Sequence, residues 1–393
     1  MADTKLRRII ISGGGVAGAA LACALTNEAE DTDLSITILE KDFEGNVGSV
    51  KRGEAIRPEV VKALHEIGLL EYVKRRKPVE VTRPKQEVWH SLLGKLGSID
   101  YGVLERNYPM MFLPHHEIVQ SLYDRLRETK VSVLYGAETT GVKIDSDGKP
   151  SVMYNQKRLE LGNDKKKDSE EKKISTDFLV VAEGGSSMLR DSLGIGVDMV
   201  DYKVGYLMVM MDKLQDMQWS RHYLTPEGFV GLFPISLDRM RAAVEIDVSQ
   251  LKGWLSVDKN QIKQRIAFRI GMAPEVHDLG VFYRVIRRHA SNYFCRNAVL
   301  IGDAAHTTHP MMGQGMSMVF HDISVLSKLI LEKPELREEE LSKFEMSTRI
   351  YNSTIIQNNH DLFEVYTAIG KDPSKMAQYH DILSRIGFVP ESG

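Results

Sequence analysis

The sequence predicts an α/β fold in which a βαβ unit near the N-terminus is combined with an inserted antiparallel sheet and with C-terminal helices. Three observations support this prediction. A β-branched strand, a glycine-rich turn and a small-residue helix follow one another between Arg7 and Glu28. Apolar and polar residues alternate in several runs between about 198 and 285. A second buried-type strand, NAVLIG, then precedes a long helical stretch.

The composition is that of an ordinary globular chain and excludes several classes of function. The 393 residues are 42% hydrophobic and 27% charged, which suits one large domain or two. The 51 basic and 54 acidic residues nearly balance, so we expect no nucleic-acid partner. Cys23 and Cys295 form no CxxC motif, which argues against a disulfide framework and a zinc site. We expect a cytoplasmic protein, monomeric or homodimeric, with no secretory signal and no integral membrane segment.

The first half of the chain predicts alternating strands and helices. The first strand and a helix ending at about Asn27 are followed by a second strand, LSITILEKD. Two amphipathic helices are predicted, at 57–76 and at 115–128, with apolar residues at helical spacing. Short strands are predicted at 130–136 and 151–155. The mixed charges of 163–173 predict a solvated hairpin tip.

The second half of the sequence predicts a change from alternating strands and helices to an antiparallel sheet, and then a return to strand and helix. ISTDFLVVAEGG reads as a buried strand that ends in glycines. The runs VGYLMVMMD, GFVGLFPI and RMRAAVEIDV predict an antiparallel sheet. Helices are predicted at 316–330 and, as the longest candidate, at 337–369. The chain therefore leaves its first layer and comes back to it.

The glycine turn between the first strand and the first helix predicts a dinucleotide site. Gly13-x-Gly15-x-x-Gly18 permits a tight turn, lets backbone approach a pyrophosphate and allows close helix packing. Val16 and Ala17 belong to the same turn. Glu40, followed by Lys41, ends the second strand, where a carboxylate can bind the adenosine ribose. This turn alone does not separate FAD from NAD.

The loop IGDAAHTTHPMMGQGMS, at 301–317, favours a flavin. Asp303 follows a buried strand, and Pro310, Gly313 and Gly315 precede a helix whose first backbone N–H groups would face a ligand. A simple nicotinamide dehydrogenase has no need of a second element that returns to the same nucleotide. His306 and His309 make a weak metal pair because no third ligand is near, so we expect no metal.

With these residues the chain resembles the class A flavoprotein monooxygenases, the family of p-hydroxybenzoate hydroxylase. Three motifs match in order over roughly residues 7–330: the glycine turn with Glu40, EGGSSMLR at 183–190, and GDAAHTTHPMMGQGMS. The resemblance implies a Rossmann-like FAD-binding domain of the GR2 type. It also implies that Asp303 holds a flavin ribityl or ribose hydroxyl, that Pro310 lies against the isoalloxazine ring, and that Arg52 approaches the flavin and its phosphates. The backbone contacts to the ring would come from Gly313, Gln314, Gly315 and Met316.

Three departures from the family pattern affect the site. Glu183-Gly184 stands where relatives usually have Asp-Gly, which puts the contacts of this acid in doubt. His115 replaces an arginine that often opens the helix there, and we include it among the cofactor-binding candidates. Ser317 replaces an asparagine, so its backbone can still serve while its side-chain contact changes.

The resemblance implies boundaries for the parts of the chain. The FAD-binding domain would take 1–197, with a small substrate-side segment at about 75–115, and 286–335. The antiparallel substrate domain would take 198–285, and C-terminal helices would take 336–393. These boundaries are expectations.

The resemblance also implies the activity. Non-covalent FAD would be reduced by transiently bound NADH or NADPH, and O2 would form a C4a-hydroperoxide that hydroxylates an aromatic or polyketide-like small molecule. Two alternatives stay open: a hydroxylase or epoxidase of an isoprenoid or quinone-type substrate, since parts of the chain also resemble squalene epoxidase, and a protein that holds FAD without turnover. The catalytic residues are unknown, with Pro310, His309 and His222 as candidates near flavin or substrate.

Overall fold

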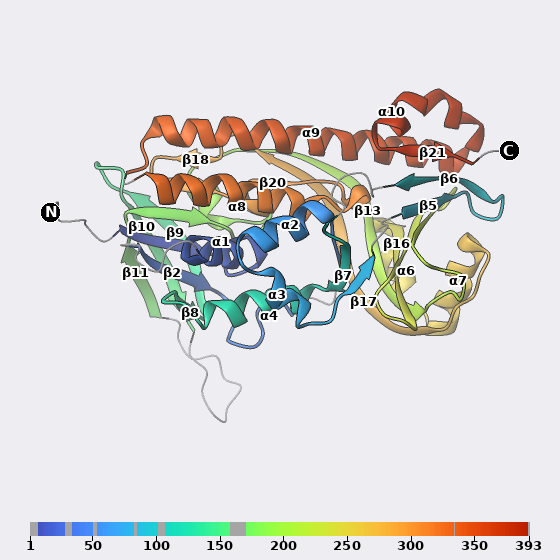
Figure 1. Cartoon of the computed structure of the whole chain (residues 1–393), viewed down its shortest axis with the longest axis horizontal. Helices are drawn as coiled ribbons and strands as arrows, with labels where there is room; N and C mark the ends of the chain where they lie inside the picture. Colours follow the sequence, from blue (N-terminus) through green and yellow to red (C-terminus); the bar gives the residue numbers. More distant parts are fainter. Residues whose placement is uncertain are drawn as a thin grey trace.

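A computed structural model describes residues 7–27, 34–49, 53–81, 85–100, 107–157, 170–333 and 335–391. Its two largest sheets have six and nine strands and lie at opposite ends of an elongated molecule (Figure 1). Helices cover both sheets along one side. The cleft described below lies between these parts.

The six-stranded sheet contains the predicted βαβ unit. Its order is β18-β19-β12-β1-β2-β8, and the five strands from β19 to β8 are parallel. The strands are β1 (Arg7–Ser12), β2 (Leu34–Glu40), β8 (Ser132–Tyr135), β12 (Phe178–Val181), β18 (Phe294–Cys295) and β19 (Ala298–Leu300). Because parallel strands end at the same edge, the turns after β1, β2 and β12 meet there.

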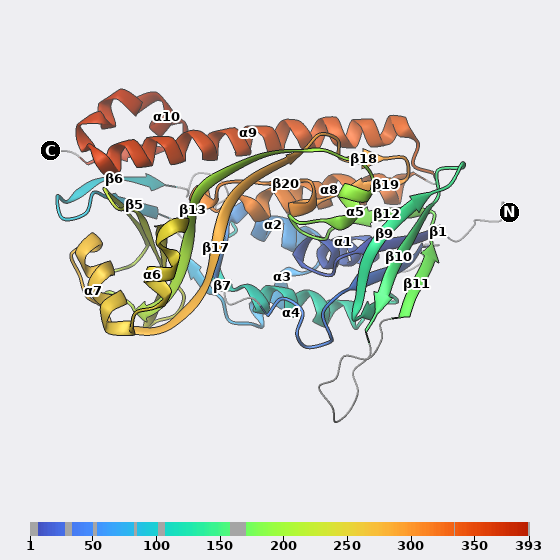
Figure 2. The same cartoon turned by 180° about the vertical axis from the view of Figure 1, so that it is seen from behind.

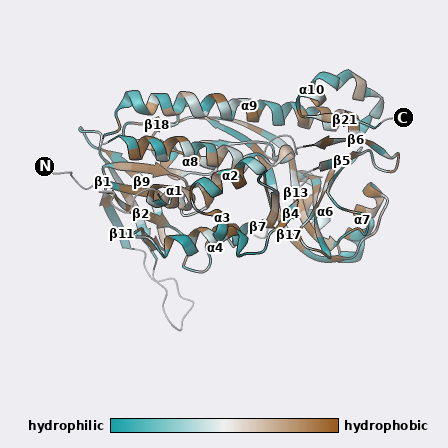
Figure 3. Ribbon diagram, in the orientation of Figure 1, coloured by the Kyte–Doolittle hydropathy of each residue, from teal (hydrophilic) through white to brown (hydrophobic). Residues whose placement is uncertain are grey.

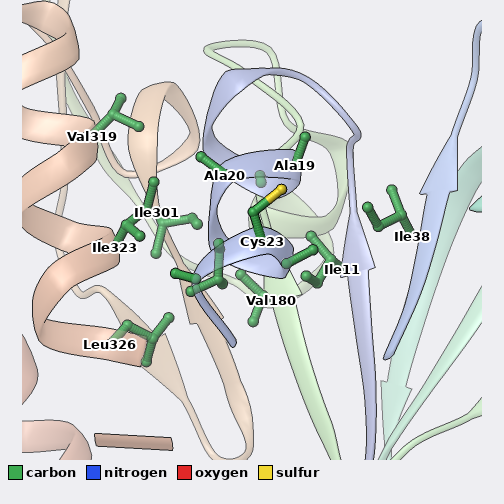
Figure 4. Packing of buried hydrophobic residues seen from close by; sticks show 14 of the residues in the cluster. Ile11, Ala19, Ala20, Cys23, Ile38, Val180, Ile301, Val319, Ile323 and Leu326 are labelled. Carbon is green, nitrogen blue, oxygen red and sulfur yellow. The ribbon is translucent and has the colours of Figure 1, made fainter. Parts of the chain in front are cut away.

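Small side chains allow helix α1 (Val16–Asn27) to pack closely on this sheet. Its buried stretch runs from Gly18 to Leu25 and consists mainly of alanine and leucine. Figure 4 shows Ala19, Ala20 and Cys23 of α1 between the sheet and helix α8 (Gly315–Glu332). The returning C-terminal segment thus completes the layer that the N-terminus begins.

The nine-stranded sheet is mainly antiparallel and has the order β20-β17-β13-β16-β15-β14-β5-β6-β21. Its strands are β5 (Lys85–Trp89), β6 (Lys95–Asp100), β13 (Val197–Asp212), β14 (Ser220–Thr225), β15 (Gly228–Pro234), β16 (Arg239–Asp247), β17 (Val276–Ala290), β20 (His306–Thr307) and β21 (Phe388–Pro390). Strands β13 and β17 curve together from this sheet toward the six-stranded one (Figure 2).

In the described ranges, the remaining strands form two three-stranded sheets: β9 (Ala137–Ile144), β10 (Pro150–Gln156) and β11 (Glu170–Ser175); and β3 (Gly53–Ile56), β4 (Val79–Val81) and β7 (Met110–Pro114). The other α-helices are α2 (Pro58–Glu66), α3 (Leu70–Lys74), α4 (His115–Leu126), α5 (Met188–Ser192), α6 (Leu251–Leu255), α7 (Lys259–Ile270), α9 (Glu338–Lys371) and α10 (His380–Arg385). The 3₁₀ turns are η1 (Val248–Gln250), η2 (Gly302–Ala304), η3 (Pro310–Met312) and η4 (Pro373–Tyr379).

Helix α9 bridges the two large sheets. It packs on α8 at its beginning and on β14 and β15 toward its end. Hydrophobic and hydrophilic segments alternate along its ribbon (Figure 3), as expected of a helix with one buried face.

Two expectations for secondary structure were wrong. The single helix predicted at 57–76 is two helices, α2 and α3, because Gly68 adopts a left-handed φ of 71°. A Cβ on Gly68 would also lie 2.3 Å from Oδ1 of Asn27. In the antiparallel segment, helices α6 and α7 follow β16, although only strands were expected.

The domain boundaries stay predictions, and so does the hairpin tip, because 158–169 lie outside the described residues. Within the described ranges, no helix is both long enough and apolar enough to span a bilayer.

Candidate functional site

A cleft with a volume of ≈ 720 Å³ lies at the carboxyl ends of β1, β2 and β12. That volume falls in the range of small-molecule sites. The walls come from the β1–α1 turn, the end of β2, β9, the β12–α5 turn, β17 and the η2–α8 loop. The sequence-predicted residues that line it are Gly13, Gly15, Val16, Ala17, Glu40, Lys41, His115, Asp303, Pro310, Gly313, Gly315 and Met316.

The glycine turn has the geometry that a close backbone approach requires. Gly13 has a φ of 101°, and a Cβ on it would lie 2.4 Å from the carbonyl oxygen of Ala182. A Cβ on Gly18 would lie 2.0 Å from the carbonyl oxygen of Gly13, so this glycine permits the helix to begin close to the turn. A Cβ on Gly15, in contrast, would meet no atom within 4 Å, because this residue faces the open cleft.

Glu40 is positioned by two backbone hydrogen bonds. Its Oε2 accepts from the Gly14 N–H at 2.7 Å, and its Oε1 accepts from the Asp42 N–H at 2.8 Å. Burial raises the pKa of Glu40 from its ordinary value, while these N–H groups oppose the rise. Since each carboxylate oxygen can accept a second hydrogen bond, the side chain can still bind ligand hydroxyls.

The η2–α8 loop forms the opposite wall. Asp303 is exposed in the cleft, whereas Gly302 before it and Ala304 after it are buried. Gly313 ends η3 with a φ of 63°, and α8 begins at Gly315. Pro310 and Met316 line the cleft on either side of this bend. The loop therefore presents an acid, a rigid ring and a helix N-terminus to one ligand space.

A buried carboxylate anchors this loop. Asp322 of α8 accepts hydrogen bonds from the Gly302 N–H (2.9 Å), from His306 Nε2 (2.6 Å) and from Asn352 Nδ2 (3.0 Å). Asp322 and His306 are 0% and 1% exposed. His306 is thus bonded within the protein.

Three other predicted residues do not line the cleft. Gly18 faces the turn, as described. Gln314 precedes α8, and its Oε1 accepts from Asn359 Nδ2 at 3.1 Å. Ser317 is buried, and its hydroxyl donates to Glu59 at 2.9 Å. Arg52 lies outside the described residues.

The two catalytic candidates among the histidines are buried away from the cleft surface. His309 is 0% exposed, and its ring lies 4.4 Å from Phe363 and 4.8 Å from Tyr202, measured between centroids. His222 lies in β14, next to β5, with its ring 4.7 Å from Phe229 and 6.0 Å from Tyr366 of α9. Burial lowers the pKa of each to about 3, so both stay neutral near pH 7. Neither is among the lining residues, and of the three catalytic candidates only Pro310 is.

Glu183, the departure from the family's Asp-Gly pair, is held from four sides. Its Oε1 accepts from the hydroxyls of Ser12 and Thr139, and its Oε2 accepts from the Ser187 hydroxyl (2.7 Å) and the Leu189 N–H (3.0 Å). Four donors fill the lone pairs of a carboxylate. The extra methylene of glutamate lets one side chain join β1, β9 and α5, so Glu183 acts here as a structural clamp beside the cleft.

Sequence reasoning missed the wall that β17 provides. Tyr283, Arg284, Val285, Ile286 and Arg288 line the cleft, as does Thr139 of β9. The basic residues in YRVIRRH interrupt an otherwise apolar strand and were an available signal. Their approach to the glycine turn, however, depends on how β13 and β17 cross between the sheets.

These residues fit a flavin dinucleotide. No side chain blocks the approach of a ligand to Gly15, and Glu40 supplies a carboxylate where a ribose would bind. The second wall of the cleft includes the N-terminus of α8. The family model described as FAD binding domain matches residues 7–341. The chain belongs to this FAD-binding family. It is an FAD-dependent monooxygenase of class A.

Curated relatives of this flavoprotein cover most of its length. It is 23% identical to the ubiquinone biosynthesis monooxygenase COQ6, mitochondrial, of Danio rerio, over 84% of this chain and 75% of that protein. It is 24% identical to the ubiquinone hydroxylase UbiL of Rhodospirillum rubrum, over 84% and 74%. It is 23% identical to the 3-demethoxyubiquinol 3-hydroxylase of Escherichia coli, over 90% and 88%.

Solved structures share the flavoprotein's fold. PqsL from Pseudomonas aeruginosa, described as a probable FAD-dependent monooxygenase, superimposes with a TM-score of 0.78 at 20% identity, over 95% of this chain and 99% of that one. The p-nitrophenol 4-monooxygenase PnpA from Pseudomonas putida DLL-E4 gives 0.72 at 17% identity, over 98% and 99%. At such identities these matches concern the fold alone.

Proposed function

We propose that this flavoprotein hydroxylates the aromatic ring of a quinone-type small molecule, using NADH or NADPH and O2. The observation that carries the proposal is that relatives matching 84–91% of the chain are named as monooxygenases or hydroxylases of ubiquinone biosynthesis. They favour the quinone-type alternative over a polyketide-like substrate. The cytoplasmic location and the monomeric or homodimeric state stay predictions.

The chemical character of the cleft near Pro310 supports an aromatic, largely apolar substrate. Met208, Tyr283 and Val285 line the cleft together with Pro310. Methionine adapts to irregular apolar shapes, and a tyrosine ring offers both a flat face and a hydroxyl. Arg284, the nearest cation along β17, is paired with Asp201.

The protein's own residues would bind and orient the reactants. Gly15 and the start of α8 would accommodate the anionic and polar parts of the cofactor, and Asp303 and Glu40 would accept hydrogen bonds from its hydroxyls. Met208, Tyr283 and Val285 would hold the substrate ring and keep water away. Bound FAD supplies the redox chemistry, namely acceptance of a hydride and activation of O2.

The test is an anaerobic absorbance experiment on the purified holoprotein. NADH and NADPH are added separately, with a short-chain quinol, a simple phenol or an acyclic isoprenoid. We expect flavin bands that bleach faster with the quinol and, once isotope-labelled O2 is admitted in place of air, a product that contains one labelled oxygen atom.

Other outcomes would redirect the assignment. Faster bleaching with the isoprenoid alone would favour an epoxidase. Flavin that never bleaches with either nicotinamide would contradict the proposal and favour the alternative of a protein that holds FAD without turnover.

A further inference from the structure

A carboxyl group is buried in the nine-stranded sheet, on the second strand from β17, whose residues line the cleft. Glu245 of β16 is 8% exposed. Burial of a carboxylate in a sheet is costly unless it is compensated, so a group of this kind calls for an explanation. None of the roles described above uses it.

Glu245 belongs to a row of proton-carrying groups that crosses three neighbouring strands. Tyr206 of β13 is paired in register with Glu245 on one side and with Tyr283 of β17 on the other. The Tyr206 hydroxyl donates to Glu245 Oε2 at 3.4 Å. The rings of Tyr206 and Tyr283 have centroids 5.7 Å apart, and Tyr283 lines the cleft. The row therefore begins at a buried carboxyl and ends at the cleft wall.

The residues around Glu245 leave space for its carboxyl group, and Arg269 bonds to the Glu245 backbone rather than to that carboxyl group. Gly228 of β15 has a φ of 113°, and a Cβ there would lie 3.0 Å from Glu245 Oε1. The backbone N–H of Phe229 also donates to the carboxyl. Arg269 of α7 uses its Nη1 for the Glu245 backbone carbonyl, at 2.7 Å, and stacks over Trp254.

The balance of these effects leaves Glu245 able to change its charge near neutral pH. Burial raises its pKa to about 7, against the opposing effects of the Phe229 N–H, Arg269, the Tyr206 hydroxyl and, from the end of α9, Lys371. A carboxylate held in a purely structural ion pair would have its pKa lowered instead. Groups with pKa values near the working pH suit proton transfer.

We propose that Glu245 and Tyr206 hold a proton behind the cleft, and that Tyr283 connects this pair to a hydroxyl group of the bound aromatic substrate. The inference rests on the proposed function, because it takes the substrate to be a phenol or quinol. It assigns a task to three residues that neither the family match nor the relatives' names address.

The proton step balances without any redox change. The substrate O–H bond breaks, and its electron pair stays on the substrate oxygen as a phenolate. The proton goes to the Tyr283 oxygen while Tyr283 releases its own proton to Tyr206, by a direct hydrogen bond or through one water. Tyr206 in turn gives its proton to the Glu245 carboxylate, which becomes a carboxylic acid. Both tyrosines end neutral, and the electron-rich phenolate is the form that accepts an electrophilic oxygen.

The pH dependence follows from the raised pKa. Below about pH 7 Glu245 is protonated and cannot accept a proton, whereas above about pH 7 it can. Formation of the bound phenolate should therefore increase as the pH rises through this value.

The experiment measures the ionisation of a bound phenol by the holoenzyme. 4-Nitrophenol is titrated into wild type, Glu245→Gln and Tyr206→Phe from pH 5.5 to 9, and its phenolate is followed by difference absorbance against the unliganded protein. We expect both variants to raise the apparent pKa of the bound probe by at least about one unit, which is tenfold in the ionisation constant. Glu227→Gln, an exposed acid on the adjoining turn, serves as the control and should behave as wild type.

Three results would overturn the proposal: unchanged titration in both variants, a probe bound in its neutral form at every pH, or a wild-type site that binds no 4-nitrophenol. Because the two variants alter different ends of one hydrogen bond, misfolding of either leaves the other to decide. Reduction of the flavin by NADH and NADPH is recorded on the same samples. Failure of that reduction would count against the proposed function, while the 4-nitrophenol titration would still judge the proton pair.

Discussion

Gly15 and Asp303 occupy opposite walls of the cleft, and each depends on what its neighbours leave open. Gly15 has no protein atom within reach of a Cβ, while Gly13 and Gly18 are confined by backbone carbonyls. Asp303 is exposed between two buried residues. At this scale, contacts with the cofactor and stability of the fold can be changed separately.

Replacement of Gly15 by alanine should weaken FAD binding without unfolding the protein. The added methyl group fills space that the pyrophosphate needs, so we expect the Kd for FAD to rise at least about tenfold, or about 1.4 kcal/mol. The melting temperature of the apoprotein should stay near that of wild type. Gly253→Ala is the matched control. A Cβ on Gly253 also meets no atom within 4 Å, but this residue lies in α6 and does not line the cleft. Equal FAD affinity in the two variants would refute the role of Gly15.

Replacement of Asp303 by alanine should yield protein that purifies largely without FAD, since a positioned acceptor for a cofactor hydroxyl is lost. Glu40→Ala should weaken binding more mildly. The flavin-to-protein ratio of each preparation, from absorbance, checks both expectations. A fully yellow Asp303→Ala protein would place that acceptor elsewhere.

At the scale of elements, helix α8 and the loop before it form one mechanical unit. The Asp322 carboxylate joins α8 to the loop through Gly302 and His306, and to α9 through Asn352. All three donors are buried or part of buried backbone. The position of the flavin loop therefore depends on a side chain that touches no ligand.

Asp322→Ala should lower the free energy of unfolding by about 3–5 kcal/mol, because three buried donors lose their acceptor at once. Denaturant titration of the apoprotein measures this directly. On the same helix, Glu332 is 57% exposed with Lys328 3.8 Å away, and Glu332→Ala should cost less than about 0.5 kcal/mol. Similar losses of unfolding free energy in the two variants would show that the Asp322 hydrogen bonds do not hold the loop in place.

At the scale of the whole molecule, two long strands and one long helix connect the glycine-turn layer to the substrate-side sheet. Strands β13 and β17 carry Met208 and the β17 wall to the cleft, and α9 packs on α8, β14 and β15 along one side of the molecule (Figure 2). Burial under α9 also keeps His222 and His309 neutral. Packing between the two sheets thus links pH to the stability of the entire fold.

The protein should lose stability on acidification. The pKa of His309 is about 3 in the folded chain and near 6.5 when unfolded, so the unfolded state binds more protons below pH 6.5. Stability falls as the pH drops from about 6.5 toward 3, by about 2 kcal/mol per such histidine at pH 5. Glu245 acts in the opposite sense between pH 7 and 4.5, because its folded pKa is raised, and offsets part of the loss.

His309→Phe should reduce this loss. We expect the variant's stability relative to wild type to improve by about 2 kcal/mol between pH 7.5 and pH 5, measured by denaturant titration. His380, whose side chain is 72% exposed, provides the control, and His380→Phe should leave the pH slope unchanged. A parallel slope for His309→Phe and wild type would mean that the buried ring is protonated in the folded protein.

The sequence by itself determined the βαβ unit, the glycine turn with its acid, the returning flavin loop and the family. These features are local, because φ preferences, strand patterning and glycine spacing act within a few residues. Most of the cofactor-binding candidates that it identified line the cleft.

Only the tertiary structure decided how distant residues meet. A side chain at Gly68, where one predicted helix breaks, would collide with Asn27, and the clamp at Glu183 joins residues from 12 to 189. His222 and His309, which the sequence offered as catalytic candidates, are buried by a helix more than 50 residues further on. The β17 wall and the row from Glu245 to Tyr283 arise from strand register, which is set by the packing of whole sheets rather than by local preference.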